Sequence, residues 1–204
     1  PQLSSAEYMW PIAISQNKSV RAGIFSNTNN YLPSKVSTES YVFGANHNMD
    51  VMLLTVDQED FFDDDSGIYV FGPEGTFDTW QPYFGANFWE DWERPIQFSF
   101  YKNNSNEFAK FNAGVKIFGG WSRGQNGQRS LAIYARGQYG DSEFEHSFFD
   151  NIPYNKFQAF VLRSSGQDWL RSNIKDIMLT SLMRGSGLDF QEHNPVATYI
   201  NGEY

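Results

Sequence analysis

The most informative stretch of the chain reads GVKIFGGWSRGQNGQRSLAIYAR, residues 114–136. It contains two short apolar runs separated by a segment rich in Gly, Ser and Asn, a composition typical of a turn. The first run continues back to FAKFNA at residues 108–113, and the second is SLAIYAR at residues 130–136. We therefore predict two neighbouring strands joined across the Gly119-Gly120 turn.

Further strands are predicted before and after this hairpin. Short apolar or alternating runs occur at residues 51–56 (VMLLTV), 67–72 (GIYVFG) and 96–101 (IQFSFY). The segment VATYINGEY at residues 196–204 contains the Asn-Gly pair of a hairpin turn. Residues 72–95 are rich in Gly, Pro, Asn and aromatic residues, and such long excursions are usually functional.

One long helix is predicted over residues 166–184. Apolar residues recur there at three- and four-residue spacing, at Leu170, Ile174, Ile177, Met178 and Leu182. Asp168 falls in the first turn of this helix, and Arg184-Gly185 supplies the basic residue and the glycine expected at its end. The predicted fold class is α+β, mainly an antiparallel β-sheet with one long helix.

The composition of the chain excludes several classes of protein. A formal net charge of −9 over 204 residues argues against general attraction to nucleic acid or to an anionic membrane. The absence of cysteine excludes disulfides, zinc–thiolate sites and thiol nucleophiles. No segment approaches the roughly 18 apolar residues of a membrane span. The aromatic content of 18% is typical of β-rich proteins and of surfaces that bind sugars or flat rings.

The first 43 residues predict three strands, in PIAIS (11–15), SVRAGIF (19–25) and SKVSTESYVF (34–43). Together with YLPS at residues 31–34, they resemble the end of the immunoglobulin-like module at the C-terminus of chitobiase and β-hexosaminidase-type proteins. The resemblance implies the terminal strands of a β-sandwich spacer in an exported bacterial protein. We therefore expect residues 1–43 to belong to that module and residues 44–204 to a second domain.

The second domain contains five segments in an order that resembles a known family. They are FFDDDSGIYV (61–70), NFWEDWERPIQFSFY (87–101), GVKIFGGWSRGQNGQRSLAIYAR (114–136), FVLRSSGQDW (160–169) and NPVATYINGEY (194–204). In this order they resemble the N-terminal part of the spore coat protein H (CotH) family of atypical, secreted protein kinases.

The CotH resemblance implies a bilobal kinase-like fold that binds ATP with Mg²⁺ or Mn²⁺ and phosphorylates protein hydroxyls. This chain would be a truncated, N-lobe-like part of that fold in an exported protein, extracellular or at the cell surface. In the family, the metal-binding and catalytic carboxylates lie after the NGEY hairpin. The resemblance thus implies that these 204 residues contain no catalytic residue and are inactive alone.

Four cations are candidates for contacts with the nucleotide phosphates, because phosphoryl transfer depends on positioning and charge neutralisation. They are Lys116, Arg123, Arg129 and Arg136, of which the first three flank the Gly-Gly turn. Members of the family commonly have Lys-Ser where this chain has Arg129-Ser130, and arginine does not reproduce the compact charge of lysine. The alternative is that all four are ordinary solvated or ion-paired cations.

Two further clusters have both a functional and a structural interpretation. Asp63, Asp64 and Asp65 could bind Ca²⁺, or they could cap a turn through their own backbone. Trp80, Trp89 and Trp92 could form a platform for a sugar or peptide, or the core beneath a long loop.

The aromatic cluster supports an alternative function, a non-catalytic cell-surface protein that binds carbohydrate or adheres through a kinase-like fold. Its partner would be a surface glycan rather than a protein substrate. A purely structural spacer would have no ligand at all. In each case, an exposed strand edge near the C-terminus could pair with another copy of the chain.

Overall fold

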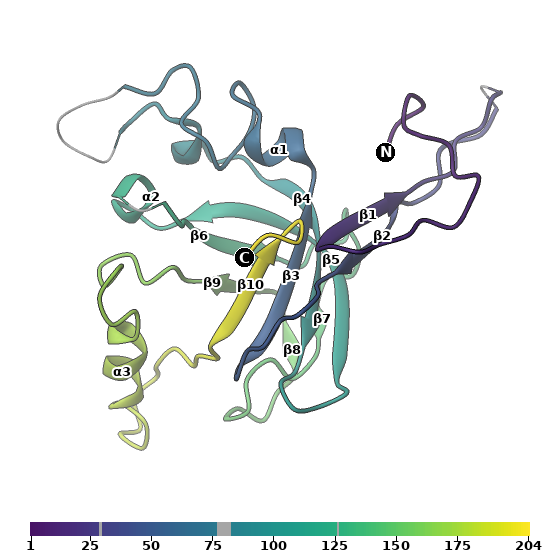
Figure 1. Ribbon diagram of the computed structural model, residues 1–204. Helices are drawn as coiled ribbons and strands as arrows, with labels where there is room; N and C mark the ends of the chain where they lie inside the picture. Colours follow the sequence, from purple (N-terminus) through teal and green to yellow (C-terminus); the bar gives the residue numbers. More distant parts are fainter. Residues whose placement is uncertain (29, 77–82, 126) are drawn as a thin grey trace. The chain divides into compact units, whose positions relative to one another are not determined.

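The computed structural model describes residues 1–28, 30–76, 83–125 and 127–204 (Figure 1). The strands are β1 Lys18–Ala22, β2 Ser37–Tyr41, β3 Asp50–Val56, β4 Arg94–Tyr101, β5 Phe108–Phe118, β6 Ser130–Tyr134, β7 Phe144–Glu145, β8 Lys156–Phe157, β9 Ala159–Leu162 and β10 Val196–Ile200. The helices are short: α1 Gln58–Phe62, the 3₁₀-helix η1 Asn87–Trp89, α2 Ser122–Gln125 and α3 Lys175–Ser181. The strand order of the main sheet is β10-β3-β4-β5-β6-β9. The protein is thus mostly β, as expected.

The chain divides into two compact units. The first unit contains residues 1–55, 97–108 and 196–204, and the second contains residues 56–96 and 109–195. The predicted boundary near residue 44 stays a prediction.

In the first unit, β3 is almost completely buried and β10 lies beside it (Figure 1). The two strands are parallel, with Val196 opposite Asp50, within a sheet expected to be mainly antiparallel. After β10 the chain turns at Asn201 and Gly202, which have φ values of 52° and 91°. Such positive values are those of an Asn-Gly hairpin turn, and Ile200 bridges to Glu203 across it. The predicted strand and turn are both confirmed.

In the second unit, β5, β6 and β9 are antiparallel neighbours, which confirms the hairpin predicted from residues 114–136. Gly114 lies opposite Tyr134, and Leu131 lies opposite Leu162. The core of this unit contains large, fully buried side chains, including Phe61, Phe88, Phe144, Val115 and Ile133. The high aromatic content of the chain is therefore used in part for packing.

Two predicted strands are wrong. Residues 11–15 have no regular structure. Residues 67–72 do not join a sheet, because their backbone binds the segment of α1 instead. The amide of Ile68 donates to the carbonyl of Asp60 at 3.0 Å, and that of Tyr69 donates to the carbonyl of Phe61 at 3.0 Å. An apolar run long enough to form a strand thus folds back and hydrogen-bonds to α1.

The long helix predicted over residues 166–184 is also wrong. The only helical part of it is α3, which has 7 residues. Leu170 and Asn173 have φ values of 60° and 56°, and such left-handed residues interrupt a right-handed helix. Within the described part of the chain, no helix is both long and apolar enough to cross a membrane.

Asp168 stabilises the turns that replace the first half of the predicted helix. Its carboxylate accepts hydrogen bonds from the hydroxyl of Ser172 and from the amide of Lys175. The hydrogen bond from Ser172 holds the pKa of Asp168 below its ordinary value of 3.8. A carboxyl with a depressed pKa stabilises the folded state above its ordinary pKa, and this contribution is lost as the pH falls through the folded-state pKa.

We therefore predict that Asp168→Asn lowers the free energy of unfolding at neutral pH, and that the difference from the wild type shrinks as the pH falls below about 4. Denaturant unfolding of both proteins across this pH range measures the effect. Asp65→Asn, at an exposed aspartate, is the control and should change little. A deficit for Asp168→Asn that does not depend on pH would show that the carboxylate charge contributes nothing.

Candidate functional site

The short segment from Asn87 to Glu93 contacts all four candidate cations. Asn87 fixes its position. Asn87 is 4% exposed, and its side-chain amide nitrogen donates to the carbonyls of Asp64 at 2.9 Å and Gly67 at 3.1 Å. Its backbone amide donates to the carbonyl of Phe71 at 2.9 Å. Gly72 is required beside it, because a Cβ there would lie 2.0 Å from the Asn87 side-chain oxygen.

Lys116 and Arg136 are ion-paired with carboxylates of this segment. Lys116 Nζ lies 2.9 Å from Asp91 Oδ1, and Arg136 Nε lies 2.7 Å from Glu93 Oε1. The hydrogen bond from Lys116 lowers the pKa of Asp91, and the hydrogen bond to Glu93 raises the pKa of Arg136. Gly114 makes room for Glu93, since a Cβ there would lie 2.5 Å from Glu93 Oε1. For these two cations the ion-paired interpretation holds in the structure.

Arg123 holds the turn between β5 and β6 against η1. Its Nε donates to the carbonyl of Gly119 at 2.6 Å, and its Nη1 donates to the carbonyls of Phe88 and Trp89 at 3.3 and 3.4 Å. The guanidinium also lies 5.4 Å from the centroid of the Trp89 ring. Desolvation lowers the pKa of Arg123, partly offset by the charge of Asp91. Its donors are thus used mainly by backbone carbonyls.

Arg129 differs from the other three cations. Its guanidinium stacks on Phe88, 4.1 Å from the ring centroid, and lies 5.2 Å from the centroid of Tyr69. Its Nε is buried and has no hydrogen-bond partner among the described residues. The guanidinium also forms no ion pair with any described residue. Desolvation lowers the pKa of Arg129. A buried charged donor without a partner is costly, so this guanidinium is suited to bind an anion.

Tyr69 fixes the backbone of Arg129. The amide of Arg129 donates to the hydroxyl oxygen of Tyr69 at 2.8 Å. Burial raises the pKa of Tyr69, which keeps its hydroxyl neutral. Phe88 and Tyr69 therefore position the side chain and the main chain of the same residue.

The three aspartates of the acidic turn do not act together. Asp63 Oδ1 accepts hydrogen bonds from the amides of Asp65 and Ser66 and from the Ser66 hydroxyl, each at 3.0 Å. The bond from that hydroxyl is the main cause of a lowered pKa for Asp63. Across the described ranges, no group of three acidic or histidine side chains is placed to hold a metal ion. The turn-capping interpretation accounts for Asp63, and Ca²⁺ binding by Asp63, Asp64 and Asp65 stays a prediction.

The proposed tryptophan platform is only partly visible, because Trp80 lies outside the described residues. Trp89 is half-buried, and its ring lies 4.9 Å from that of Phe84 and 5.4 Å from the Arg123 guanidinium. Trp92 is also half-buried, with the Arg94 guanidinium 5.2 Å from its ring centroid. Both indoles are thus already in contact with the protein's own side chains.

Comparison with protein families gives a match for the part of the chain that carries the four cations. Residues 115–204 match the CotH kinase protein family. No curated protein and no solved structure shows a significant match. The CotH match begins on β5 and includes Lys116, Arg123, Arg129 and Arg136, whereas the acidic turn, Trp89 and Trp92 precede it.

Over residues 115–204 the match confirms the resemblance to CotH that the sequence predicted, but it does not include the segments at residues 61–70 and 87–101. It does not reach residues 1–43, so the immunoglobulin-like origin of that segment stays a prediction. Sequence reasoning identified the cations of the CotH-like part but missed their partners Asp91, Glu93, Tyr69 and Phe88. The only signal in the sequence was the acidic run EDWE at residues 90–93, close to a cluster of aromatic residues.

We predict that Asn87→Asp destabilises the protein by about 2–4 kcal/mol, because a carboxylate would replace a buried amide donor opposite two carbonyl oxygens. Denaturant unfolding measures this loss. Asn104→Asp, at an exposed position, is the matched control and should leave the free energy of unfolding nearly unchanged. Equal stabilities for Asn87→Asp and the wild type would contradict the role assigned to this amide.

Proposed function

We propose that this chain is the N-lobe-like part of an exported CotH-like atypical protein kinase and that Arg129 contacts the phosphates of ATP. The observation that carries the proposal is the Arg129 guanidinium, which is desolvated, stacked on Phe88 and without a counter-charge among the described residues. A stacked guanidinium keeps its edge available for an anion, and bonds from charged donors to phosphate are strong. The family match supports the proposal at the level of the CotH family.

The surroundings of Arg129 indicate how the other cations would contribute. Arg123, a residue of α2, contacts the same 3₁₀-helix η1, since it donates to the carbonyl of Phe88, whose ring lies against the Arg129 guanidinium. It would add positive potential while most of its donors stay on backbone carbonyls. Lys116 and Arg136 would have to leave Asp91 and Glu93 before they could bind a phosphate directly.

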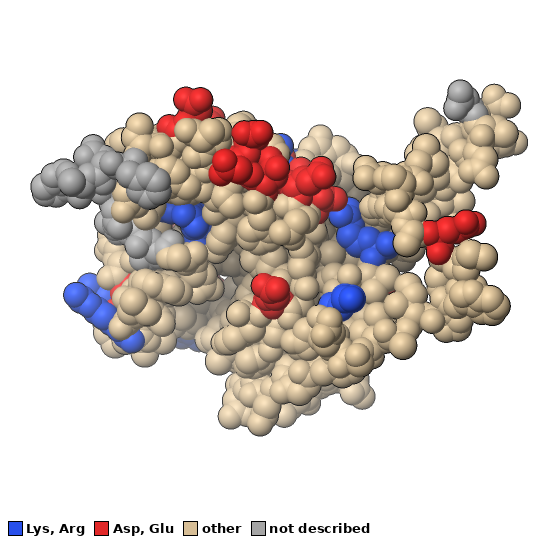
Figure 2. Space-filling view, turned by 45° about the horizontal axis from the view of Figure 1, so that its top comes forward, with Lys and Arg blue, Asp and Glu red and all other residues tan. Residues whose placement is uncertain are grey.

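Directed contacts, rather than a broad basic surface, would have to hold the phosphates. On the face shown in Figure 2, Lys and Arg side chains occur in small separate groups, while Asp and Glu gather in several places. The formal net charge of −9 also disfavours general attraction of polyanions. The affinity for a nucleotide would therefore depend strongly on a single well-placed arginine.

ATP would enter with Mg²⁺ or Mn²⁺, which neutralises charge on the transferred phosphate. In this proposal the carboxylates that hold the metal and orient the protein hydroxyl are supplied after residue 204, as the CotH resemblance implies. The 204 residues alone would then bind nucleotide without transferring phosphate. Location outside the cell and a protein substrate belong to the same proposal.

We predict that Arg129→Gln weakens binding of ATP with Mg²⁺ about ten-fold or more, because it removes a charge-assisted contact. Arg136→Gln should weaken binding by no more than about three-fold, since this guanidinium is held by Glu93 in an exposed ion pair. Isothermal titration calorimetry of the chain extended beyond Tyr204 measures both. Arg163→Gln, at an exposed arginine paired with Asp176, is the control and should bind like the wild type.

Further results would test whether Arg129 contacts the nucleotide. Arg129→Lys keeps the charge but loses the planar stack, so it should bind ATP between the wild type and Arg129→Gln, and its thermal unfolding shows whether the fold is intact. A larger loss from Arg136→Gln than from Arg129→Gln would contradict the assignment of the site. No binding by the wild type at millimolar ATP would contradict nucleotide binding altogether and would favour the carbohydrate-binding alternative.

A further inference from the structure

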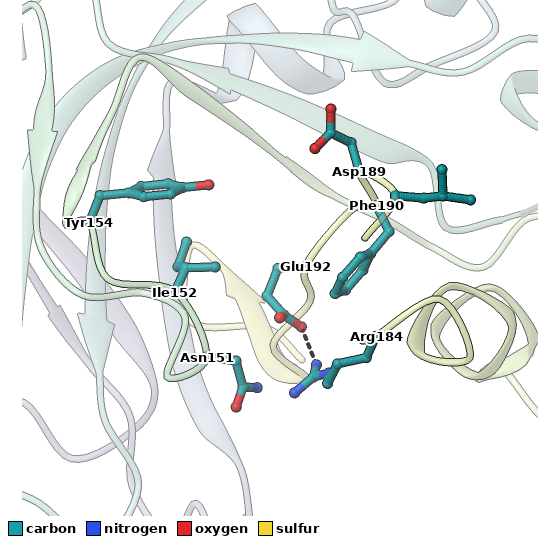
Figure 3. A pocket seen from close by; sticks show the side chains of 8 residues that line it. Asn151, Ile152, Tyr154, Arg184, Asp189, Phe190 and Glu192 are labelled. Carbon is teal, nitrogen blue, oxygen red and sulfur yellow. Dashed lines mark hydrogen bonds and ion pairs between the residues drawn. The ribbon is translucent and has the colours of Figure 1, made fainter. Parts of the chain in front are cut away.

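A separate cavity lies between the loop at residues 151–154 and the segment that follows α3 (Figure 3). Its volume is about 360 Å³. This is at the small end of the usual range for ligand pockets, about 300–1,000 Å³. The residues that line it are Asn151, Ile152, Tyr154, Arg184, Leu188, Asp189, Phe190 and Glu192.

An ion pair fixes one side of this cavity. Arg184 Nη2 lies 2.7 Å from Glu192 Oε1, and the same oxygen accepts a hydrogen bond from the amide of His193 at 3.2 Å. The Glu192 side chain is only 10% exposed, so the pair is partly shielded from water. The guanidinium and the carboxylate therefore present a preformed set of donors and acceptors to the cavity.

Three other polar side chains of the lining have unused hydrogen-bonding capacity. Asn151, Tyr154 and Asp189 are exposed, and their side chains form no hydrogen bond with the rest of the described chain. Together they offer an amide, a hydroxyl and a carboxylate, which can both donate and accept. Figure 3 shows Tyr154 on one side of the cavity and Asp189 on the other, on two different segments.

The remaining lining is apolar. Phe190 and Ile152 are half-buried, and Leu188 is 62% exposed. The Phe190 ring lies beside the Arg184–Glu192 pair (Figure 3), and the Arg184 guanidinium is 5.9 Å from its centroid. An aromatic ring thus lies next to a group of planar polar side chains.

We propose that this cavity binds one ring of a neutral carbohydrate. A sugar ring has an apolar C–H face that packs against an aromatic side chain, and its hydroxyls both donate and accept hydrogen bonds. Phe190 supplies the aromatic surface, Asn151, Asp189 and the Arg184–Glu192 pair supply planar groups for neighbouring hydroxyls, and Tyr154 supplies a further hydroxyl.

The charges of the lining select against other ligand classes. One arginine against two carboxylates leaves a net negative charge, which disfavours phosphates and acidic sugars. A cation would find Glu192 already neutralised by Arg184, and an exposed Asp189 alone attracts a cation only weakly. A neutral polyhydroxylated ligand satisfies the unused donors and acceptors without an unpaired charge.

The cavity is separate from the proposed nucleotide site, because none of its lining residues belongs to the cluster around Arg129. It also differs from a platform at Trp89 and Trp92, which are absent from the lining. The two sites can therefore be tested separately.

The test is NMR titration of the 204-residue chain with three neutral trisaccharides, maltotriose, cellotriose and triacetylchitotriose. We expect saturable shifts of amide signals at residues 151–154 and 184–192 with at least one of them at millimolar concentration. Phe190→Leu should weaken that binding about five-fold through loss of the aromatic face, and Asn151→Ala should weaken it about three-fold or more. Because Asn151 is exposed, the second variant tests the site without disturbing the core.

Trp89→Leu is the matched control, because it removes a half-buried aromatic residue outside the cavity. It should bind the trisaccharide as the wild type does. The proposal is overturned if none of the three sugars shifts the signals of the two segments, or if Trp89→Leu abolishes binding while Phe190→Leu and Asn151→Ala do not. Shifts of the same signals by spermidine or by sialyllactose, but by no neutral sugar, would also overturn it.

Discussion

The arrangement of the four candidate cations depends on one buried amide, that of Asn87. Its two donated hydrogen bonds tie η1 to the carbonyls of Asp64 and Gly67, which lie 23 and 20 residues earlier in the chain. If the buried Asn87 amide had no such partners, the folded state would be destabilised by roughly several kcal/mol, the penalty for burying an unpaired polar group. The segment that follows is therefore held in place, and with it the ring of Phe88 and the carboxylates of Asp91 and Glu93.

The position of this segment places the four cations in three different environments. Lys116 and Arg136 meet a carboxylate each, whereas Arg123 meets backbone carbonyls and Arg129 meets only aromatic rings among the described residues. Cations in ion pairs contribute little net attraction for a further anion, because their field is already compensated. Among these four cations, Arg129 therefore retains the strongest attraction for a further anion.

The sequence predicted secondary structure correctly where strands that are neighbours in the chain pair with each other. It failed where hydrogen bonds to more distant residues determine the backbone conformation. The apolar runs within residues 114–136 correctly predicted β5 and β6, since these two strands follow one another in the chain and pair with each other. The apolar run at residues 67–72 has the same appearance, yet Tyr69 donates to Phe61 and no ladder forms. The apolar spacing of residues 166–184 likewise carries no information about the left-handed backbone at Leu170 and Asn173. The cations could be identified from the hairpin, but Lys116 and Asp91 are 25 residues apart, and their pairing depends on the folded path of the long excursion.

The arginine at position 129 fits its surroundings better than the lysine that the CotH resemblance places there. A planar guanidinium can lie flat on the Phe88 ring at 4.1 Å and still direct its edge elsewhere, which an ammonium group cannot do. A lysine at this position would require a nearby carboxylate to offset its desolvation, and the described residues place none against Arg129. The aromatic pair Phe88 and Tyr69 therefore acts as the support that a carboxylate would otherwise provide. On this argument, the departure from the family's lysine changes how the cation is held while it keeps a positive charge at the same point of the hairpin.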